Sequence, residues 1–447
     1  MKFVRALLFH SIFILVVMTT VMDSTIGQSS APDHIVLTWK EDPMNSQSVS
    51  WRTEKKIEQP LAQIMEASAA PYGEEKAKYV EAYVQQIKLE RGKEYFYYSA
   101  TFKGLLPGKK YCYRVGGSEG EWSPWTHFQV ATEDSDTFSF IYLGDVQNDI
   151  LSWGARSIRA AYAHEPGADF TLFAGDCVND AHRDGQWMEW FDALGYVTGS
   201  TPIIPVTGNH EYDDELNPKS EDVLSVFWPL QFELPLNGPK GLEESAFFMD
   251  YKSMRLVVLN STMALRSAQE LEKQTRWLEA TLSGNSKKWT VVTFHHALFS
   301  ARDGNHGDYP KLRDAWLPVL EKHKVDLVLM GHDHVYGRSS RQMRTIEVPE
   351  GDAGPVYVVS VAGPKMYGIR PSKRWMERAA VNTQMYQTIT IEGDHLKFRA
   401  YTVLDELYDS FDLKKQKGKY NKFVENISSE NSPENVFPHG GYTRKPE

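Results

Sequence analysis

Apolar residues along the chain follow two different patterns, and the change between them falls near Thr137. Before that point, short runs of β-branched and aromatic residues are separated by turn-rich segments such as residues 106–108, which is typical of β-strands joined by tight turns. The runs lie between residues 31 and 132: HIVLTW, SVSWRT, YFYYSATF, KYCYRVG and WTHFQVAT. Their spacing predicts an all-β sandwich of roughly a hundred residues, with tryptophan and tyrosine in its core.

After Thr137, apolar runs alternate with segments of helical periodicity. The runs FSFIYLGD, DFTLFAGD, PIIPVTGNHE, WTVVTFHH and VDLVLMGHDH each stop at glycine or at polar residues. Between them lie SWGARSIRAAYAHE, SAQELEKQTRWLEATL and KLRDAWLPVLEKH, in which apolar residues recur at three-to-four spacing. This alternation predicts a layered α/β core with ligands gathered at the carboxyl ends of its strands. Further strands and a polar tail over residues 413–447 complete the chain.

Composition and charge narrow the classes of partner. The chain has 447 residues, of which 41% are hydrophobic, as in an ordinary globular protein. Its 59 acidic and 49 basic residues give a formal charge of -10, which argues against a nucleic-acid backbone or an anionic membrane surface as the main partner. Cys112 and Cys177 are too few for a disulfide scaffold and are interpreted as small buried residues.

Residues 1–27 have the pattern of a signal peptide. Lys2 and Arg5 precede an apolar run over residues 6–22, and small residues fit cleavage before Gln28. We therefore expect a secreted, periplasmic or otherwise extracytoplasmic protein. An uncleaved N-terminal membrane anchor is the alternative, because the apolar run approaches the ~20 residues that span a bilayer.

Polar residues with metal-binding side chains stand at all five strand ends. A single Gly-Asp after an apolar run is a common turn, so the argument rests on the combination of two Asp, one Asn and three His in one α/β pattern. Oxygen and imidazole ligands of this kind suit iron, zinc or manganese and need no thiolate. The candidate ligands are Asp145, Asp176, Asn209, His295, His332 and His334.

In chain order, GDVQ, GDCVN, GNHE, VTFH and GHDH resemble the five motifs of the calcineurin-type metallophosphoesterases, and most closely those of the purple acid phosphatases. GLLPGKKYCYRVG and WSPWTHFQVAT resemble a fibronectin type III module, which that family also carries at its N-terminus. The resemblance covers nearly all of residues 31–412. It implies a fibronectin type III-like sandwich over residues 31–132, followed by an α/β metallophosphoesterase domain of layered sheets over residues 137–412.

The resemblance also implies a ligand set for two metal ions. Asp145, Asp176 and His334 would hold the first ion. Asp176, as the bridge, would hold the second together with Asn209, His295 and His332. Two divalent ions of iron, zinc or manganese would outweigh the two carboxylates, so the site would keep a net positive charge for a phosphate dianion and could generate a nucleophilic hydroxide. His295 is preferred over its neighbour His296 because its spacing in VTFH matches the family motif.

Two further histidines are implied as catalytic residues. His210 in GNHE resembles the histidine that contacts a phosphoryl oxygen or protonates the leaving group in this family. His306, in the glycine-rich loop ARDGNHGDYP, lies near the position of further substrate-contacting histidines, although this loop does not align residue for residue. Glu211 is expected to support the ligands without binding metal.

The sequence departs from the purple enzymes at two positions. The residue three after the bridging Asp is a tyrosinate on ferric iron in those enzymes, whereas here it is Asn179. A neutral amide is a poor ligand for a hard ferric ion, which argues against an iron(III) centre and against the purple colour. Gln147 stands where the purple enzymes have glycine, and its amide oxygen would either reach the first metal or only shape the turn.

These features predict an exported acid phosphatase-like enzyme that hydrolyses small phosphate monoesters by attack of metal-bound hydroxide. A phosphodiesterase or nucleotide pyrophosphatase with the same metals is the first alternative, because the motifs specify phosphorus chemistry and not the leaving group. A non-catalytic exported binding protein is an alternative of another class. The sequence leaves open the substrate, the identity of each metal and the oligomeric state.

Overall fold

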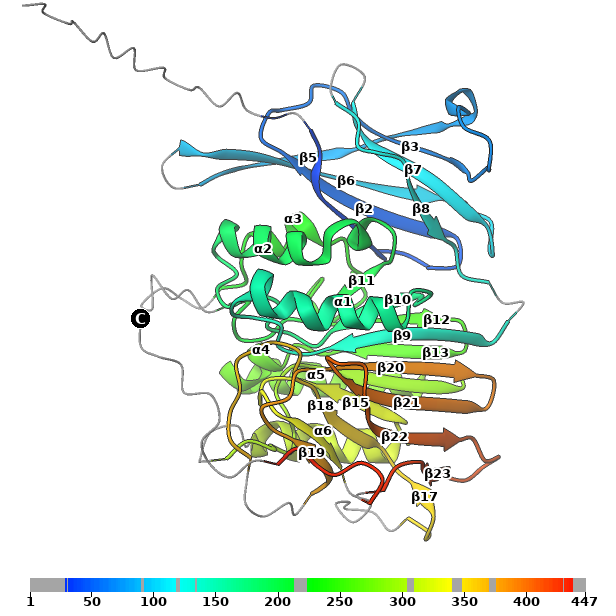
Figure 1. The fold of residues 1–447 in the computed structure, drawn as a ribbon, viewed down its shortest axis with the longest axis vertical. Helices are drawn as coiled ribbons and strands as arrows, with labels where there is room; N and C mark the ends of the chain where they lie inside the picture. Colours follow the sequence, from blue (N-terminus) through cyan, green and yellow to red (C-terminus); the bar gives the residue numbers. More distant parts are fainter. Residues whose placement is uncertain are drawn as a thin grey trace, which may run out of the picture.

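The computed structural model describes residues 29, 31–89, 92–117, 121–132, 135–212, 223–303, 309–339, 348–369, 375–428 and 430–436. The predicted signal segment lies outside these residues. Within the described ranges, no helix combines the length and the apolar character needed to cross a membrane. An N-terminal pair of sheets stacks against a larger α/β body (Figure 1).

The N-terminal part is a sandwich of two antiparallel sheets with the strand orders β1-β2-β6-β5 and β4-β3-β7-β8. Its strands are β1 (Asp33–Thr38), β2 (Ser46–Thr53), β3 (Pro60–Glu66), β4 (Lys78–Glu81), β5 (Tyr83–Lys88), β6 (Glu94–Lys103), β7 (Lys110–Gly117) and β8 (Thr126–Gln129). Trp51, Tyr98 and Phe128 pack between the sheets, as the pattern predicts. The sequence pattern did not predict β3, β4 and β5. Strands β4 and β5 expose most of their residues, and β3 (PLAQIME) contains proline, glutamine and glutamate and lacks a continuous run of β-branched and aromatic residues.

The first sheet of the α/β body has the order β11-β10-β9-β20-β21-β22-β23-β17. Strands β9, β10 and β11 are parallel, and β20 pairs with β9 in the antiparallel direction. The elements are β9 (Thr137–Leu143), α1 (Ala155–His164), β10 (Phe170–Phe173), α2 (Asp184–Leu194), β11 (Ile203–Pro205), β17 (Asp352–Ala353), β20 (Met385–Glu392), β21 (His395–Thr402), β22 (Leu407–Lys414) and β23 (Asn421–Glu425).

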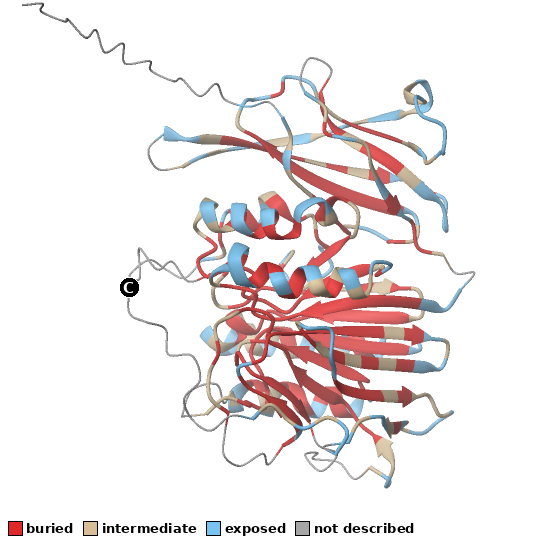
Figure 2. Cartoon of the chain, in the orientation of Figure 1, coloured by how far each residue is buried: buried red, intermediate tan, exposed pale blue. Residues whose placement is uncertain are grey.

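The second sheet has the order β12-β13-β14-β15-β18-β16-β19, with β13, β14, β15 and β18 parallel. Its strands are β12 (Phe247–Tyr251), β13 (Met254–Val258), β14 (Trp289–Thr293), β15 (Leu327–Met330), β16 (Tyr336–Ser339), β18 (Val356–Val359) and β19 (Met376–Ala380). The accompanying helices are α3 (Phe227–Gln231), α4 (Ser261–Arg266), α5 (Ala268–Ser283) and α6 (Pro310–Lys322). Both sheets are buried along most of their length, whereas the helices expose one side (Figure 2).

The five apolar runs that end in polar residues form β9, β10, β11, β14 and β15, as predicted. Each is almost entirely buried, because sheet faces covered on both sides favour continuous apolar runs. Three helices also begin where local chemistry favours it. Asn260 and Ser267 accept backbone N–H groups at the starts of α4 and α5, and Pro310 occupies the first turn of α6.

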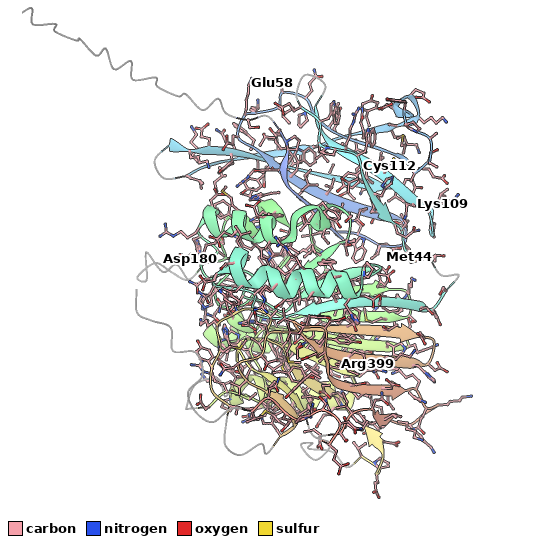
Figure 3. All side chains as sticks on the ribbon, in the orientation of Figure 1. Met44, Glu58, Lys109, Cys112, Asp180 and Arg399 are labelled. Atoms are coloured by element: carbon pink, nitrogen blue, oxygen red, sulfur yellow. The ribbon has the colours of Figure 1, made fainter. Side chains whose placement is uncertain are left out.

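The segment expected to be a polar tail contributes to the first sheet. β22 extends to Lys414, and β23 pairs with both β22 and β17. Phe423 of β23 is buried and stacks on Phe411, with 5.2 Å between ring centroids. Phe423 thus packs this strand, which lies between β22 and the short edge strand β17, onto the core, and the polar composition around it concealed the strand in the sequence. Cys112 and Cys177 are both buried free thiols, in agreement with their interpretation, and Figure 3 shows Cys112 within the sandwich.

Arg52 of β2 connects the sandwich to α2 through a buried ion-pair network. Its side chain is 1% exposed. Nε and Nη2 donate to the two carboxylate oxygens of Asp33 at 2.9 and 2.8 Å, and Nη1 donates to Asp184 at 2.6 Å. The guanidinium also lies 4.0 Å from the ring centroid of Tyr95. Arg52 is therefore a fully desolvated cation within the contact between the two parts of the chain, which other hydrogen bonds, such as that from Tyr113 to Gly199, also hold together.

Replacing Arg52 should destabilise the protein strongly. Arg52→Ala leaves Asp184 without its buried cation, and we expect a loss of about 3 kcal/mol in the free energy of unfolding, at the lower end of the usual range because Asp33 is half exposed. Urea titration followed by circular dichroism measures the change. Lys56→Ala, which breaks an exposed pair with Glu58, is the matched control and should cost less than about 1 kcal/mol. Equal effects of the two substitutions would contradict this role for Arg52.

Candidate metal centre

Side chains from four strand ends of the two sheets converge into a buried cluster. Asp145 follows β9, Asp176 follows β10, His295 follows β14, and His332 and His334 follow β15. They form two overlapping groups, Asp176 with His295 and His332, and Asp145 with Asp176 and His334. In each group the candidate ligand atoms lie within 4.8 Å of one another. Asp176 belongs to both groups, which is the geometry that a bridging carboxylate requires.

Backbone conformation at these strand ends is unusual for residues with side chains. Asp145, Asp176, His332 and His334 have φ values of 51°, 50°, 73° and 51°. Left-handed backbone of this kind costs on the order of 1 kcal/mol or more for each such residue and persists only where surrounding contacts enforce it. Four of the candidate ligands share this strained conformation, which is a recurring feature of functional sites.

Two glycines of the sequence motifs are needed because the ligands pack directly against their backbone. A Cβ atom on Gly208, which opens GNHE, would lie 2.1 Å from Oδ1 of Asp176. A Cβ atom on Gly331, which opens GHDH, would lie 2.4 Å from Oδ2 of Asp145. Any larger residue at these positions would displace a carboxylate.

Backbone carbonyl groups orient two of the histidines. Nδ1 of His295 donates to the carbonyl of Ala174 at 2.8 Å, and Nδ1 of His334 donates to the carbonyl of Lys365 at 2.9 Å. The opposite nitrogens therefore face the carboxylates, with Nε2 of His295 3.0 Å from Asp176 and Nε2 of His334 3.6 Å from Asp145. Metal-binding histidines are commonly fixed in this way, with one nitrogen tied to the protein and the other presented to the ion.

The buried carboxylates need a compensating positive charge. Burial raises the pKa of Asp145 well above its usual range, against the opposing charge of His295. Burial alone would lower the pKa of His295, but the charges of Asp176 and Asp145 raise it to about 10. For Asp176, burial is outweighed by the charges of His295 and His210, which hold its pKa well below the usual value. Bound cations would satisfy the same demand, so the donor set fits metal ions.

His332 is fixed by a residue that the sequence did not identify. Its Nε2 lies 2.5 Å from the hydroxyl of Tyr309, at the start of α6, and its Nδ1 lies 3.3 Å from Nε2 of His295. Nδ1 is therefore the nitrogen that faces the cluster. No sequence signal marks Tyr309, because a tyrosine beside a glycine-rich loop has no characteristic spacing from a metal ligand.

The segment after β11 reaches the cluster through Asp176. The backbone N–H of His210 donates to Oδ1 of Asp176 at 3.0 Å, and Nε2 of His210 lies 3.9 Å from Oδ2 of the same carboxylate. Asn209 is placed between Gly208 and His210, both of which adjoin Asp176. The structure thus brings the GNHE segment to the position that the sequence predicts for it.

Glu211 ties two strand ends together from beneath the cluster. Its buried carboxylate accepts the backbone N–H groups of Asp176, Cys177 and Gly208 at 3.0, 2.9 and 2.6 Å. Burial, together with the charge of Asp176, raises the pKa of Glu211 to about 8, against the effect of these N–H donors. The side chain supports the ligand loops and belongs to neither ligand group.

The two departures from the purple enzymes have different surroundings. Gln147 is fully buried, its Nε2 lies 3.0 Å from Nε2 of His334, and its Oε1 has no hydrogen-bond partner in the described part of the chain. Oδ1 of Asn179 instead accepts a hydrogen bond from Asn148 at 2.8 Å. Gln147 therefore lies beside His334 with an oxygen that could coordinate an ion. The side-chain oxygen of Asn179 instead accepts the hydrogen bond from Asn148.

The predictions for His296 and His306 have different outcomes. His296 bonds through Nδ1 to the hydroxyl of Ser261 at 2.9 Å and belongs to neither ligand group, as expected from its spacing. His306 falls in residues 304–308, outside the described residues, so its predicted role is untested.

Comparison with known proteins agrees with this geometry. A family model described as the N-terminal domain of purple acid phosphatase matches residues 32–130, and one described as calcineurin-like phosphoesterase matches residues 138–336. An uncharacterised protein of Mycobacterium tuberculosis is 30% identical over 189 residues, which are 38% of this chain and 34% of that protein. Purple acid phosphatase 21 of Arabidopsis thaliana is 25% identical over 62% of this chain and 61% of its own. The matches thus span about a third to three fifths of these relatives.

A purple acid phosphatase from yellow lupin (Lupinus luteus) seeds shares the fold. Its structure superposes with a TM-score of 0.72 and 17% sequence identity, covering 86% of this chain and 74% of the lupin chain. This likeness confirms the predicted fold class, a metallophosphoesterase body preceded by an all-β sandwich. Since both domain models match in the expected order and the fold agrees, the chain belongs to the purple acid phosphatase-like group of the calcineurin-like phosphoesterases.

Proposed function

We propose that the chain is a binuclear metal-dependent hydrolase that cleaves phosphate monoesters outside the cytoplasm. The observation that carries the proposal is the shared position of Asp176 in two buried groups of metal-ligating side chains. Paired metal ions held by a common ligand are a recurring arrangement in phosphatases. The proposal that the chain is exported is based on the signal-like pattern of residues 1–27.

The proposed ligands are the polar residues at the strand ends, Asp145, Asp176, Asn209, His295, His332 and His334. When bound, two divalent ions would attract the phosphate dianion and activate water for in-line attack on phosphorus. The chain's own contribution is to hold the donors at fixed separations. It also limits the negative charge near phosphate to two carboxylates.

Divalent iron, zinc or manganese is the proposed metal content. The amides Gln147 and Asn179 add no negative charge to this region, whereas a trivalent ion is stabilised by anionic oxygen ligands. The buried Oε1 of Gln147 is available to the ion that His334 binds. On this basis we propose a colourless enzyme, in contrast to the purple members of the family.

His210 is the residue best placed to act on the substrate. Nδ1 of His210 donates to the backbone carbonyl of Asn179, so Nε2 is left facing the carboxylate side of the cluster. The side chain is partly exposed, as are those of Asn209 and His332, whereas the other proposed ligands are buried. A phosphoryl oxygen or the leaving oxygen bound at the cluster would therefore meet Nε2 of His210 first.

Metal content and activity together test the proposed function. The purified protein should bind two divalent ions per chain by elemental analysis and hydrolyse 4-nitrophenyl phosphate much faster than bis(4-nitrophenyl) phosphate. The Asp176→Ala variant should lose both ions and all activity, because Asp176 is the shared ligand. The Asp192→Ala variant, changed on the exposed face of α2, should retain both the ions and the activity.

Faster cleavage of the diester would favour the phosphodiesterase alternative. A wild-type protein without metal or activity would favour a non-catalytic binding role.

His210→Ala should separate catalysis from metal binding. We expect full metal content and a fall in kcat of about 100-fold, the size typical of a residue that assists proton transfer. The loss should be greatest for esters with poor leaving groups, so kcat is compared across a series of substituted phenyl phosphates. Loss of metal from this variant would instead place His210 among the ligands.

Glu211→Ala should weaken metal binding although Glu211 is not a ligand. Removing the carboxylate leaves three buried N–H groups without their acceptor, at a cost on the order of 3 kcal/mol in unfolding free energy. The dissociation constants of both ions, measured by competition with a chelator, should rise at least 10-fold, as for other residues that support ligands. Glu211→Gln retains one acceptor oxygen and should recover part of both losses. Unchanged metal affinity in the alanine variant would refute the positioning role.

A further inference from the structure

A cavity of about 520 Å³ lies outside the metal centre, between α1 and the turns at one end of the first sheet. Trp153 lines it from the π-helical turn Ile150–Gly154, and Arg156 lines it from the first turn of α1. The turn 402–406 between β21 and β22 and residues 382–384 ahead of β20 complete the lining. None of the candidate metal ligands, all of which lie in the described ranges, lines this cavity.

One stretch of backbone separates the cavity from the metal centre. Pro364 and Met366 line the cavity. Lys365 lies between them, and its backbone carbonyl accepts the hydrogen bond that orients His334. A molecule bound in the cavity would therefore contact residues other than the metal ligands.

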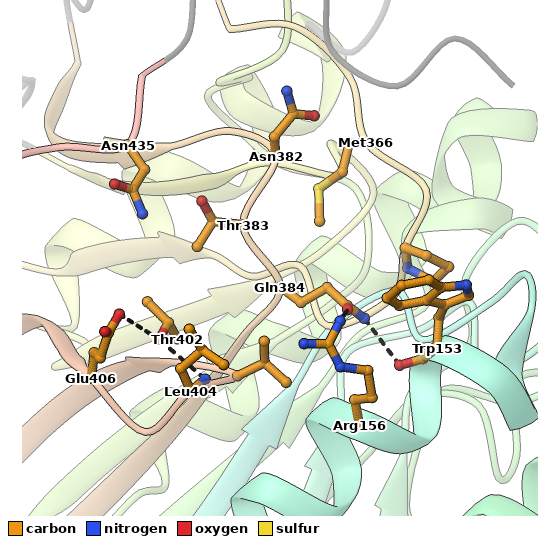
Figure 4. Close-up of a pocket in the computed structure, with 12 residues that line it drawn as sticks. Trp153, Arg156, Met366, Asn382, Thr383, Gln384, Thr402, Leu404, Glu406 and Asn435 are labelled. Atoms are coloured by element: carbon orange, nitrogen blue, oxygen red, sulfur yellow. Dashed lines mark hydrogen bonds between the residues drawn. The ribbon is translucent and has the colours of Figure 1, made fainter.

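The lining is mainly apolar and includes an exposed aromatic ring. Trp153 is 49% exposed and Leu404 is 68% exposed, and Met366 contributes its thioether. Figure 4 shows Trp153 and Arg156 on one side of the cavity and Leu404 and Glu406 on the other. Exposed apolar side chains gathered around a concave site indicate a binding surface.

Hydrogen bonds fix the aromatic side of the cavity. Nε2 of Gln384 donates to the backbone carbonyls of Trp153 at 3.1 Å and of Ala362 at 2.9 Å (Figure 4). Gln384 is itself buried. The turn that carries Trp153 is thus tied to the loop after β18, so a ring stacked on the indole would meet a preformed surface and lose less entropy on binding.

Arg156 places a positive charge beside this aromatic surface. Its guanidinium lies 5.0 Å from the ring centroid of Trp153, and Nη1 donates a long hydrogen bond of 3.4 Å to Oε1 of Gln384. Within the described ranges, Arg156 forms no ion pair with a carboxylate. A planar guanidinium presents paired N–H donors that match the two oxygens of a carboxylate. The cavity therefore combines a stacking surface with an anion-binding group.

We propose that this cavity is a second binding site, separate from the metal centre, for a small aromatic carboxylate. The ring would stack on Trp153, and the carboxylate would accept N–H groups of Arg156. One guanidinium balances a single negative charge, and Glu406 on the other side disfavours a dianion such as phosphate. A cavity of this size holds one or two fused rings. The inference does not depend on the proposed function.

Titration calorimetry with three probes that share one ring system tests the ligand class. 2-Naphthoate should bind the wild-type protein about ten-fold more tightly than the neutral 2-naphthalenemethanol, because only the carboxylate forms charge-assisted hydrogen bonds with Arg156. The cation 2-naphthylmethylammonium should bind more weakly than either, because it meets the like charge of the guanidinium. Absence of 2-naphthoate binding, equal affinity for the three probes, or tightest binding of the cation would overturn the proposal.

Substitutions in the lining test the two contacts separately. Trp153→Ala should weaken binding of both 2-naphthoate and 2-naphthalenemethanol about ten-fold, the size expected for one lost aromatic contact. Arg156→Ala should weaken binding of 2-naphthoate about ten-fold and change that of the neutral alcohol by less than about two-fold. Both side chains are exposed, so neither substitution should unfold the protein. Equal losses for the two probes in Arg156→Ala would overturn the assignment of a carboxylate.

Arg159→Ala is the matched control, since it removes another exposed arginine of α1 that does not line the cavity. It should leave the affinity for all three probes unchanged. A loss of 2-naphthoate affinity in this variant equal to that in Arg156→Ala would show that the net charge of the helix, and not a contact in the cavity, attracts the anion.

Removal of metal separates this site from the metal centre, because carboxylates also bind metal ions. After treatment with a chelator, 2-naphthoate should bind as before, since no candidate ligand lines the cavity. Loss of binding on metal removal would place the probe at the metal centre and overturn the proposal. If the wild-type protein neither holds metal nor hydrolyses esters, the proposed function fails, while weaker 2-naphthoate binding in Trp153→Ala still supports the second site.

Discussion

The buried carboxylate of Asp176 is the constraint on which the site depends. It lies within reach of two groups of candidate ligands, so the loops that carry those groups must approach it closely. Gly208 lacks a side chain because the carboxylate occupies that space. Glu211 accepts the N–H groups of Asp176 and Gly208, and thereby joins the loops that follow β10 and β11. The close approach of these loops requires left-handed backbone at Asp176, which is unfavourable in free energy, and these contacts compensate for that strain.

Sequence patterns were informative where one physical requirement determined the residues. Continuous apolar runs identified the buried strands β9, β10, β11, β14 and β15 because both faces of these sheets are covered. The polar strand ends identified the ligand cluster because few other roles would select Asp and His at successive ends. The patterns did not predict strands that are mostly exposed, nor features that depend on contacts between distant parts of the chain. Strands β4 and β5 are mostly exposed, β23 depends on Phe423, and Tyr309 reaches His332 through the fold alone.

The two amide substitutions show why position in the motif does not by itself define a ligand. Gln147 and Asn179 both stand at positions that the resemblance connects with the first metal. In the structure, Asn148 donates to the side-chain oxygen of Asn179, whereas Gln147 lies beside His334. Asn148, which has a φ of 66°, occupies the side-chain oxygen of Asn179 with this hydrogen bond. The chain therefore shares the scaffold of its family but has a more neutral environment around one metal position.

The antiparallel pairing of β20 with β9 has a consequence for biosynthesis. During translation, β9 and its parallel neighbours emerge long before β20 does. The inner edge of this sheet therefore stays open, with buried-type apolar residues exposed, until nearly the whole chain has been made. Open strand edges of this kind promote pairing between nascent chains. Chains that stay unfolded until β20 has been made avoid that hazard.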